Sequence, residues 1–278
     1  MDTNKIRALL CAVEKKSLSK AAEEFSYTPS ALSHAADSVE RELGIKLLKR
    51  TYAGVSLTEE GEKLLPALRS FVASEEKLYR EAKALGGKGE EIKIAAYSSI
   101  SLQVLPEIVK AFKLSNPSVR VSISVGNYLK NALLNGEADV VFSDSPAEGE
   151  AVWKELKKDP FVAVVPNALF AKRKSIRKEE LYEYPYISTA EGLLKGYFDE
   201  SKFKEVLRFQ SVDDNSVLSM VKEELGVAVL PRLAVKSRGK GVKLLKLEPE
   251  IHRAIGYSYL KEKQTDALRA FVKFLSKL

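Results

Sequence analysis

Five polar side chains recur at helical spacing opposite an apolar stripe. The polar set is Ser30, Ser33, His34, Asp37 and Arg41. The apolar set is Leu32, Ala35, Val39 and Leu43. Polar side chains at this spacing can hydrogen-bond to base edges and phosphates from a helix lying in a major groove. An ordinary amphipathic helix with a solvated face has the same pattern, so these residues alone leave both interpretations open.

The preceding residues predict how this helix is positioned. Residues 18–25 have the composition of a short helix, and Ser17 can cap its start. Thr28 followed by Pro29 predicts the start of a second helix, with Thr28 as N-cap and Pro29 as the first helical residue. Two short helices joined by a tight turn form the helix-turn-helix unit that reads DNA.

The segment after this helix predicts a wing. Gly44 can end the helix, and residues 45–57 read as a short hairpin with a glycine turn. Lys49 and Arg50 give the hairpin cations for phosphates or a minor groove. The candidate DNA-binding residues are therefore Thr28, Pro29, Ser30, Ser33, His34, Asp37, Lys49 and Arg50.

A heptad pattern follows in residues 58–85, which read as one long helix. Its members are Leu64, Leu68, Phe71, Glu75, Leu78, Ala82 and Leu85. Two copies can pair through such a stripe, although one helix packing on its own domain would also explain it. Pairing would place two reading helices about a dyad and predicts DNA with two dyad-symmetric half-sites.

The residues after the glycine-rich segment 86–89 predict an α/β region. Strands are expected at 92–96, 119–125, 138–142, 161–165, 186–188, 205–209, 227–230 and 253–259. Helices are expected at 102–114, 129–135, 217–225 and 265–278, and near Leu193. This alternation favours two lobes with one cleft.

Ligand-binding residues are expected in this cleft, at the carboxyl ends of strands. Ser98, Ser99, Ile100 and Ser101 follow the first strand, where hydroxyls and free amides suit a carboxylate or phosphate. A plain serine cap is an equal alternative. Weaker candidates at comparable positions are Asn127, Ser143, Thr189 and Asp214.

The chain resembles the LysR-type transcriptional regulators over essentially its whole length. The matching motifs, in order, are Ala21-Ala22, Ser30-Ala31-Leu32-Ser33, Glu42-Leu43-Gly44, Leu47-Leu48-Lys49-Arg50 and Leu57-Thr58-Glu59-Glu60-Gly61. The resemblance implies a winged helix-turn-helix, a linker helix and an effector domain shaped like the two-lobed periplasmic binding proteins. The family usually has Gln-Pro and a later Arg where this chain has Pro29-Ser30 and His34, which affects base preference.

The implied organisation has three parts: 1–57 for DNA binding, 58–88 for the linker helix and hinge, and 89–278 for effector binding. The first lobe would take about 89–160 and 259–278, and the second about 161–258. The resemblance also implies that a small-molecule effector binds in the cleft and that homodimers assemble into tetramers. The expected partners are promoter DNA and further copies of this chain, with RNA polymerase as an additional candidate.

Composition sets limits on other functions. The chain has 278 residues, a formal charge of +7 and one cysteine, so it has no internal disulfide or cysteine-rich metal site. Cys11 lies among apolar residues, which favours core packing. No signal peptide or membrane-length apolar run is present, so we expect a cytoplasmic protein that does not bind membranes. Residues 1–88 hold 15 basic and 13 acidic side chains, so most of the excess charge lies downstream.

Enzymatic motifs are not found in the sequence. His34 and His252 fall in different predicted domains, and neither lies near a nucleophile motif or metal-ligand spacing. We therefore expect no catalytic residues, metal or cofactor other than the effector. Three hypotheses are ranked in this order: a ligand-responsive transcription factor, an architectural DNA-binding protein whose second domain only oligomerises, and an enzyme on a two-lobed scaffold.

Overall fold

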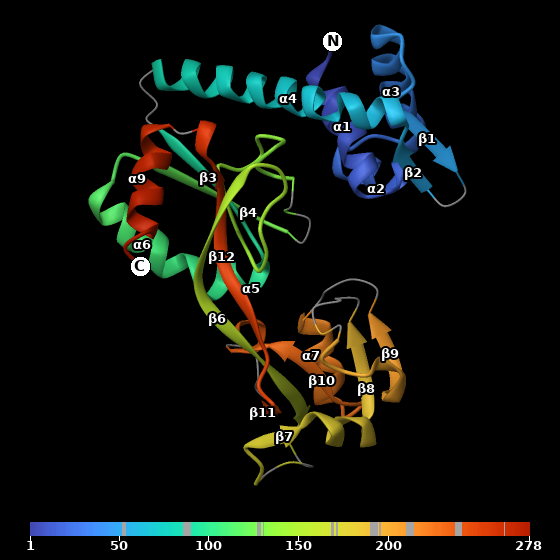
Figure 1. Ribbon diagram of the computed structural model, residues 1–278, viewed down its shortest axis with the longest axis vertical. Helices are drawn as coiled ribbons and strands as arrows, with labels where there is room; N and C mark the ends of the chain where they lie inside the picture. The colour runs from blue at the N-terminus through green and yellow to red at the C-terminus, as the bar shows by residue number, and fades with distance from the viewer. Residues whose placement is uncertain are drawn as a thin grey trace.

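The computed structural model describes residues 1–51, 54–85, 90–126, 129, 131–167, 170, 172–189, 194, 196–209, 214–236, 241–263 and 265–278. A small helical domain with a hairpin comes first, and one long helix connects it to a two-lobed α/β region (Figure 1). The fold predicted from the sequence is therefore confirmed.

The first domain contains three helices and a two-stranded hairpin. Its elements are α1 (Thr3–Glu14), α2 (Leu18–Glu24), α3 (Pro29–Leu43), β1 (Leu48–Thr51) and β2 (Gly54–Leu57). Apolar residues of α1 and α3 pack with both strands and with the start of the long helix in one core, which includes Ile6, Leu9, Val39, Leu47, Val55 and Leu68. The hairpin is thus fixed to the helices by its own buried side.

The predicted ends of α3 are confirmed. Thr28 caps the helix, its side chain accepting a hydrogen bond from the Ala31 amide at 3.1 Å, and Pro29 is the first helical residue. Gly44 closes the helix with a φ of 67°, a left-handed conformation that favours glycine. Leu32, Ala35 and Val39 are buried as predicted. Local sequence signals therefore fix where the polar face of α3 begins and ends.

The long helix α4 (Glu59–Leu85) continues through Pro66. Thr58 precedes it and accepts a hydrogen bond from the Gly61 amide at 2.9 Å. Gly61 has no room for a side chain, because a Cβ there would lie 2.5 Å from the Leu47 carbonyl oxygen. Close packing of α4 on the hairpin thus requires the glycine of the Leu57 to Gly61 motif.

The heptad of α4 divides into two parts. Leu68 is buried and Leu64 is partly buried in the core of the first domain. Phe71, Leu78 and Ala82 are exposed, and the side chain of Leu85 lies outside the described residues. The expectation of one continuous pairing stripe is therefore wrong for its first turns, which pack on their own chain, and the exposed remainder stays free for a partner.

The α/β region has an eight-stranded sheet and a separate two-stranded sheet. The large sheet runs β4 (Arg120–Val125), β3 (Glu91–Ala96), β5 (Val140–Ser143), β12 (His252–Leu260), β6 (Ala151–Pro166), β11 (Val242–Glu248) and β7 (Ser175–Arg177), and β10 (Ala228–Pro231) pairs with β6. The small sheet pairs β8 (Pro185–Thr189) with β9 (Lys204–Phe209). The antiparallel pair β6 and β12 passes from one lobe to the other (Figure 1).

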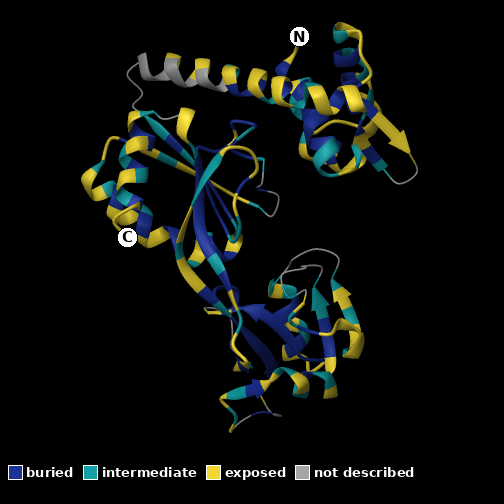
Figure 2. Cartoon of the chain, viewed as in Figure 1, coloured by how far each residue is buried: buried dark blue, intermediate teal, exposed yellow. Residues whose placement is uncertain are grey.

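Helices cover both lobes. They are α5 (Ser98–Gln103), α6 (Leu105–Ser115), α7 (Asp214–Lys222), α8 (Arg232–Val235) and α9 (Asp266–Leu275), and short 3-10 helices lie at Lys178–Glu183, Glu200–Lys202 and Lys261–Lys263. The first lobe has a core around Phe112, Phe142 and Phe271. The second has cores around Phe161 and Val164. Figure 2 shows buried strands in each lobe, so each lobe has its own interior.

Some expected elements differ from the structure. The predicted helix at 129–135 is wrong, because residues 131–136 form turns. The strand expected at 161–165 is the end of the sixteen-residue β6, and β7 and β11 were not predicted. The helix expected near Leu193 falls on residues that are mostly outside those described. The strands expected around β3, β4, β5, β8, β9, β10 and β12 are present.

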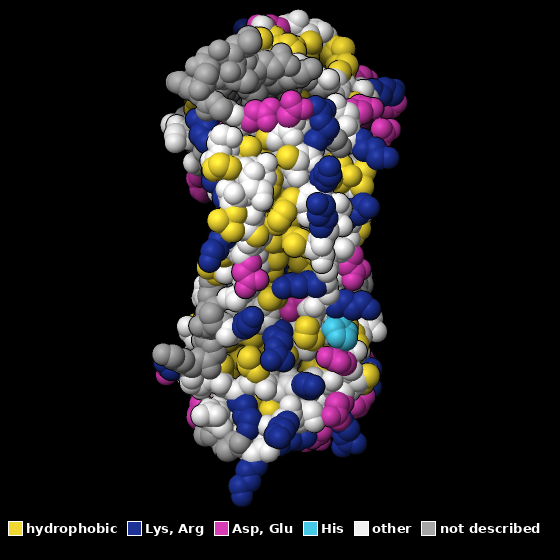
Figure 3. Space-filling view, turned by 90° about the vertical axis from the view of Figure 1, so that its left-hand side faces the viewer, with side chains coloured by type: hydrophobic (Ala, Val, Ile, Leu, Met, Phe, Trp, Pro, Cys, Tyr) yellow, Lys and Arg dark blue, Asp and Glu magenta, His cyan; other side chains and the backbone are white. Residues whose placement is uncertain are grey.

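Lys and Arg side chains are spread along one face of the molecule. Figure 3 shows them over much of its length, with acidic and hydrophobic side chains among them. Within the described part of the chain, no helix is long and apolar enough to cross a membrane, and no group of three His, Cys, Asp or Glu side chains could hold a metal ion.

Candidate DNA interface and effector site

The polar face of α3 and the wing lie on one surface of the first domain. Thr28, Pro29, Ser30, His34 and Lys49 are exposed, and the Thr28 and Ser30 hydroxyls lie 3.0 Å apart. Five of the eight predicted DNA-binding residues lie in the start and middle of α3, Thr28 caps that helix, and the other two lie in β1. The structure therefore brings the predicted set together from two elements.

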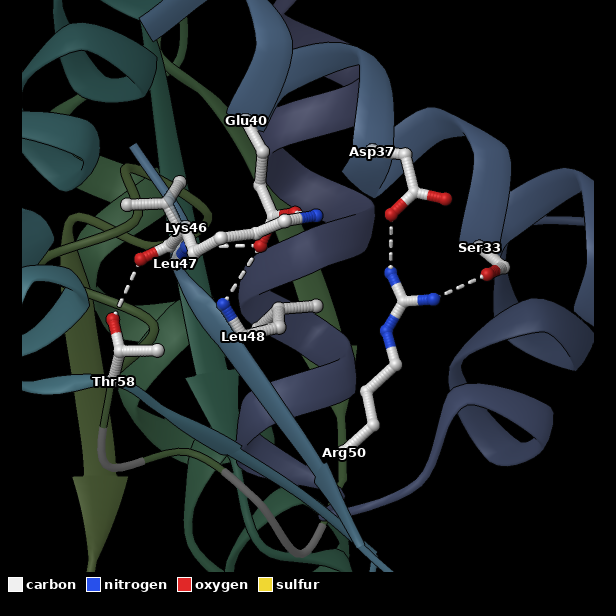
Figure 4. Close-up of polar contacts among 8 residues, drawn as sticks. All are labelled: Ser33, Asp37, Glu40, Lys46, Leu47, Leu48, Arg50 and Thr58. Atoms are coloured by element: carbon white, nitrogen blue, oxygen red, sulfur yellow. Dashed lines mark hydrogen bonds and ion pairs between the residues drawn. The ribbon is translucent and has the colours of Figure 1, made fainter. Parts of the chain in front are cut away.

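Arg50 joins these two elements. Its Nη1 donates to Ser33 Oγ at 2.7 Å, and its Nη2 lies 2.8 Å from Asp37 Oδ1 (Figure 4). The three side chains are partly exposed on the surface that carries His34 and Ser30. A guanidinium that bridges the wing and the helix fixes the position of one relative to the other.

Glu40 fixes the wing from inside, and sequence reasoning did not single it out. Its Oε1 accepts the amides of Leu47 and Leu48 at 2.8 and 2.9 Å, and its Oε2 accepts Lys46 Nζ at 2.6 Å (Figure 4). Burial alone would raise the pKa of Glu40, but the hydrogen bonds from Lys46 and from the two amides lower it. The sequence did contain a signal for this role, because Glu40 lies on the same face of the helix as the apolar Ala36 and Leu43.

A buried arginine, also not predicted, lies where the two lobes meet. Arg253 of β12 donates from Nε to Asp159 Oδ2 of β6 and from Nη2 to Ser99 Oγ of α5, each at 3.0 Å. Its Nη1 lies 3.6 Å from Asp144 Oδ2, and Asp159 Oδ1 accepts the Leu233 amide of α8 at 3.0 Å. The side chains of Arg253, Asp144 and Asp159 are 8%, 7% and 1% exposed. This hinge network ties Ser99 to both strands that connect the lobes.

The predicted effector residues are distributed over both lobes. Ser98 is exposed at the start of α5 and Ser99 is buried against Arg253. Ile100 packs in the core of the first lobe, so its side chain is not positioned to meet a ligand. The buried Ser143 hydroxyl donates to the Ser145 carbonyl at 2.6 Å.

The other candidates lie elsewhere. Ser101 follows in α5, Thr189 ends β8 and Asp214 begins α7 in the second lobe. Asn127 lies outside the described residues. Arg253, which reaches this region from strand β12 and not from one of the loops, was not among the predicted residues.

A polar contact also joins the first domain to the first lobe. Asn135 Nδ2 donates to Glu14 Oε1 at 3.3 Å and to Glu137 Oε1 at 3.2 Å. Burial raises the pKa of the Glu14 carboxyl, and loss of water also raises the pKa of Glu137. The contact borders a pocket of about 410 Å³ between the domains, lined in part by Arg7, Cys11, Phe25, Val125 and Leu129.

Cys11 has the environment of a packing residue. It is 9% exposed in the core of the first domain, and burial raises the pKa of its thiol to about 12. Because the thiolate is the reactive form, this thiol is unsuited to sensing oxidants at neutral pH. The prediction that it serves core packing agrees with this environment.

Comparison with known proteins assigns the family. Residues 3–62 match the description "Bacterial regulatory helix-turn-helix protein, lysR family" and residues 85–278 match "LysR substrate binding domain". The chain belongs to the LysR family. This LysR-type regulator is a DNA-binding transcriptional regulator with an effector-binding domain, and it is not an enzyme.

A relative and a solved structure match nearly the whole regulator, and a second solved structure matches its effector domain. The regulator is similar to "Probable HTH-type transcriptional regulator LrrA" of Synechococcus elongatus, at 26% identity over 99% of this chain and 96% of that protein. It resembles full-length CbnR, solved in complex with its target DNA, with a TM-score of 0.61 and 18% identity. The match covers 100% of this chain and 99% of CbnR. It also resembles the "Effector binding domain of QuiR in complex with shikimate", with a TM-score of 0.60 and 22% identity. This match covers 68% of the present chain and 96% of the QuiR domain. These two structures show the shared fold.

Proposed function

We propose that this regulator reads promoter DNA with α3 and the wing, as a homodimer with two dyad-symmetric half-sites, under control of a small effector bound between its lobes. The carrying observation is the surface formed by the N-cap Thr28 and by Ser30, Ser33 and His34 of α3 together with β1 of the wing, because Arg50 holds these elements in one orientation. The solved CbnR complex, which contains that protein's target DNA, supports the proposal.

The proposal assigns different roles to the reading helix and to the wing. Ser33→Ala or His34→Ala should relax base preference, because side chains on α3 face base edges. Lys49→Ala should weaken binding to all sequences and reduce the salt slope by about 1, as expected for one lost phosphate contact. Binding to randomised DNA at several salt concentrations measures both effects. Unchanged sequence preference in the α3 variants would contradict the assignment of the reading face.

The exposed end of the heptad supports pairing through α4. Phe71 is 40% exposed and Leu78 is 66% exposed, although both are large and apolar. Two copies of α4 can bury these side chains against each other. Pairs of dimers would then form tetramers. A tetramer bound to a promoter in the bacterial cytoplasm would be placed to contact RNA polymerase.

We predict that Leu78→Glu converts dimers to monomers. A carboxylate in the middle of an apolar interface loses water without gaining a partner, so the dimer dissociation constant should rise at least about 100-fold. Sedimentation at several protein concentrations measures the change. Glu62→Lys, which is about 160° away around α4 by helical geometry, is the control and should leave the dimer intact. Equal behaviour of the two variants would contradict pairing through this stripe.

The effector proposal rests on the region around Ser99. Ser98 and Ser101 supply hydroxyls near the start of α5, Arg253 lies within hydrogen-bond distance of Ser99, and Thr189 and Asp214 would contribute from the second lobe. These hydroxyls suit a small molecule with a carboxylate, while Arg253, which is paired with Asp159 and Asp144, positions Ser99. QuiR, whose effector domain was solved with shikimate, shows that a domain of this fold can hold such an acid.

Regulation would follow from a shift between two arrangements of the lobes. β6 and β12 are the strands that connect the lobes, and Arg253 and Asp159 lie on these strands. An effector that favours one arrangement of the two lobes would change how the paired DNA-binding domains are placed relative to each other. It would therefore change which DNA they bind. A coupling free energy of about 1 to 3 kcal/mol would change occupancy roughly 5- to 150-fold.

A further inference from the structure

The contact made by Arg50 determines which chemistry Ser33 and Asp37 can offer to DNA. A guanidinium carries only hydrogen-bond donors. Ser33 Oγ must therefore accept from Arg50 Nη1 at 2.7 Å, and its own hydroxyl hydrogen is free to be donated elsewhere. Ser33 is thus prepared as a donor toward an acceptor on a base edge.

Asp37 is prepared as an acceptor. Its Oδ1 is held by Arg50 Nη2 at 2.8 Å, and Figure 4 shows its second oxygen pointing away from the guanidinium. Carboxylate oxygens only accept, so a base that meets Asp37 must present a donor. In the major groove the donors are the exocyclic amino groups, N4 of cytosine and N6 of adenine.

Arg50 also makes an acidic residue tolerable on this surface. An unpaired carboxylate beside a duplex would be repelled by the phosphates, whose charge dominates binding. The Arg50 side chain is 37% exposed and that of Asp37 is 36% exposed, so the pair, 2.8 Å apart, lies at the surface. Arg50 therefore neutralises Asp37 at the place where its charge would oppose DNA.

We propose that Arg50 is a positioning residue that holds Ser33 and Asp37 as a donor and acceptor pair, and that Asp37 selects a base with an exocyclic amino group in each half-site. This inference rests on the proposed placement of α3 in the major groove. It assigns to Arg50 a role in specificity in addition to any contact of the wing with phosphates.

A double-mutant cycle tests the coupling. Arg50→Ala, Asp37→Ala and the double variant are compared on a sequence that the wild-type protein selects from randomised DNA. Arg50→Ala should lower affinity about 30-fold or more, because it leaves Asp37 unpaired, and adding Asp37→Ala should restore about tenfold of that loss. Asp37→Ala alone should keep affinity within about threefold but lose about tenfold discrimination for the amino-bearing base.

The conservative variant separates charge from geometry. Arg50→Lys keeps the positive charge but cannot bridge two partners with a planar fork, so it should keep most of the affinity and lose the discrimination. Selection of cytosine or of adenine at the position read by Asp37 tells which amino group is recognised. Lys49→Ala on the same strand is the control, and its effect should be independent of Asp37→Ala.

Two other results have different meanings. If the effects of Arg50→Ala and Asp37→Ala simply multiply and base preference is unchanged in both, the inference is overturned while DNA binding stands. If the wild-type protein itself shows no sequence preference, the proposed placement of α3 fails, and this inference fails with it.

Discussion

Replacing Arg253 by Met should destabilise the effector domain by about 3 to 5 kcal/mol, the cost of leaving buried carboxylates without their cation. Asp159 and Asp144 would lose the guanidinium, and Ser99 would lose its donor. Trp153, the single tryptophan, lies on β6 within this domain. Urea unfolding followed by its fluorescence therefore reports the affected part of the chain.

Two further variants make the result interpretable. Arg269→Met removes an arginine of α9 that is 58% exposed and paired with Asp266, and it should cost at most about 1 kcal/mol, as is usual for surface pairs. Asp144→Asn should cost less than Arg253→Met, because one carboxylate still balances the arginine. Equal and small losses for both arginine variants would show that the hinge network does not stabilise the lobes.

The second large effect is expected at Glu40. Glu40→Ala leaves the buried amides of Leu47 and Leu48 without their acceptor, which should destabilise the DNA-binding domain by about 2 to 4 kcal/mol. DNA binding should fall with it, because β1 loses one of its attachments to α3. Thermal unfolding and DNA affinity measure the two consequences. Glu42→Ala on the exposed side of the same helix is the control and should change both very little.

The pH dependence of this contribution has a definite sign. The pKa of Glu40 is lowered in the folded protein, so its stabilisation is complete above the ordinary glutamate pKa of about 4.3. It is lost as pH falls through the lower folded value, because the folded state must then bind a proton. Glu40→Gln should therefore remove part of the acid sensitivity of this domain. If Glu40→Gln loses as much stability between neutral and acidic pH as the wild-type protein does, the role given to the carboxylate is contradicted.

Local signals were enough to predict the reading helix and the wing. Thr28, Pro29 and Gly44 act on backbone groups within one or two helical turns. In the structure they form the N-cap, the first helical residue and the C-cap of α3, as predicted. β6 was harder, because its first half carries exposed Lys154, Glu155 and Lys158 and it is continuously apolar only from Pro160 to Pro166. A strand that leaves one core and enters another changes its pattern midway, so a period of two residues does not reveal its length.

The hinge network could not be predicted from spacing. Arg253 is 94 residues from Asp159 and 154 residues from Ser99, and only the pairing of β12 with β6 brings them together. Arg50 was predicted as a wing cation, but its contacts with Ser33 and Asp37 depend on how the hairpin packs on α3. Residue types thus indicated the chemistry, and the tertiary fold decided the partners.

In the proposed function, an effector bound between the lobes changes how the paired DNA-binding domains hold DNA. The most direct test is a footprint of the full-length protein on DNA upstream of its own coding region, with and without small carboxylic acids and amino acids, each matched by its amide. We expect a dyad-symmetric footprint that shortens or shifts with an acid and not with its amide. A sequence-specific footprint that stays the same with every compound would contradict effector control through the lobes.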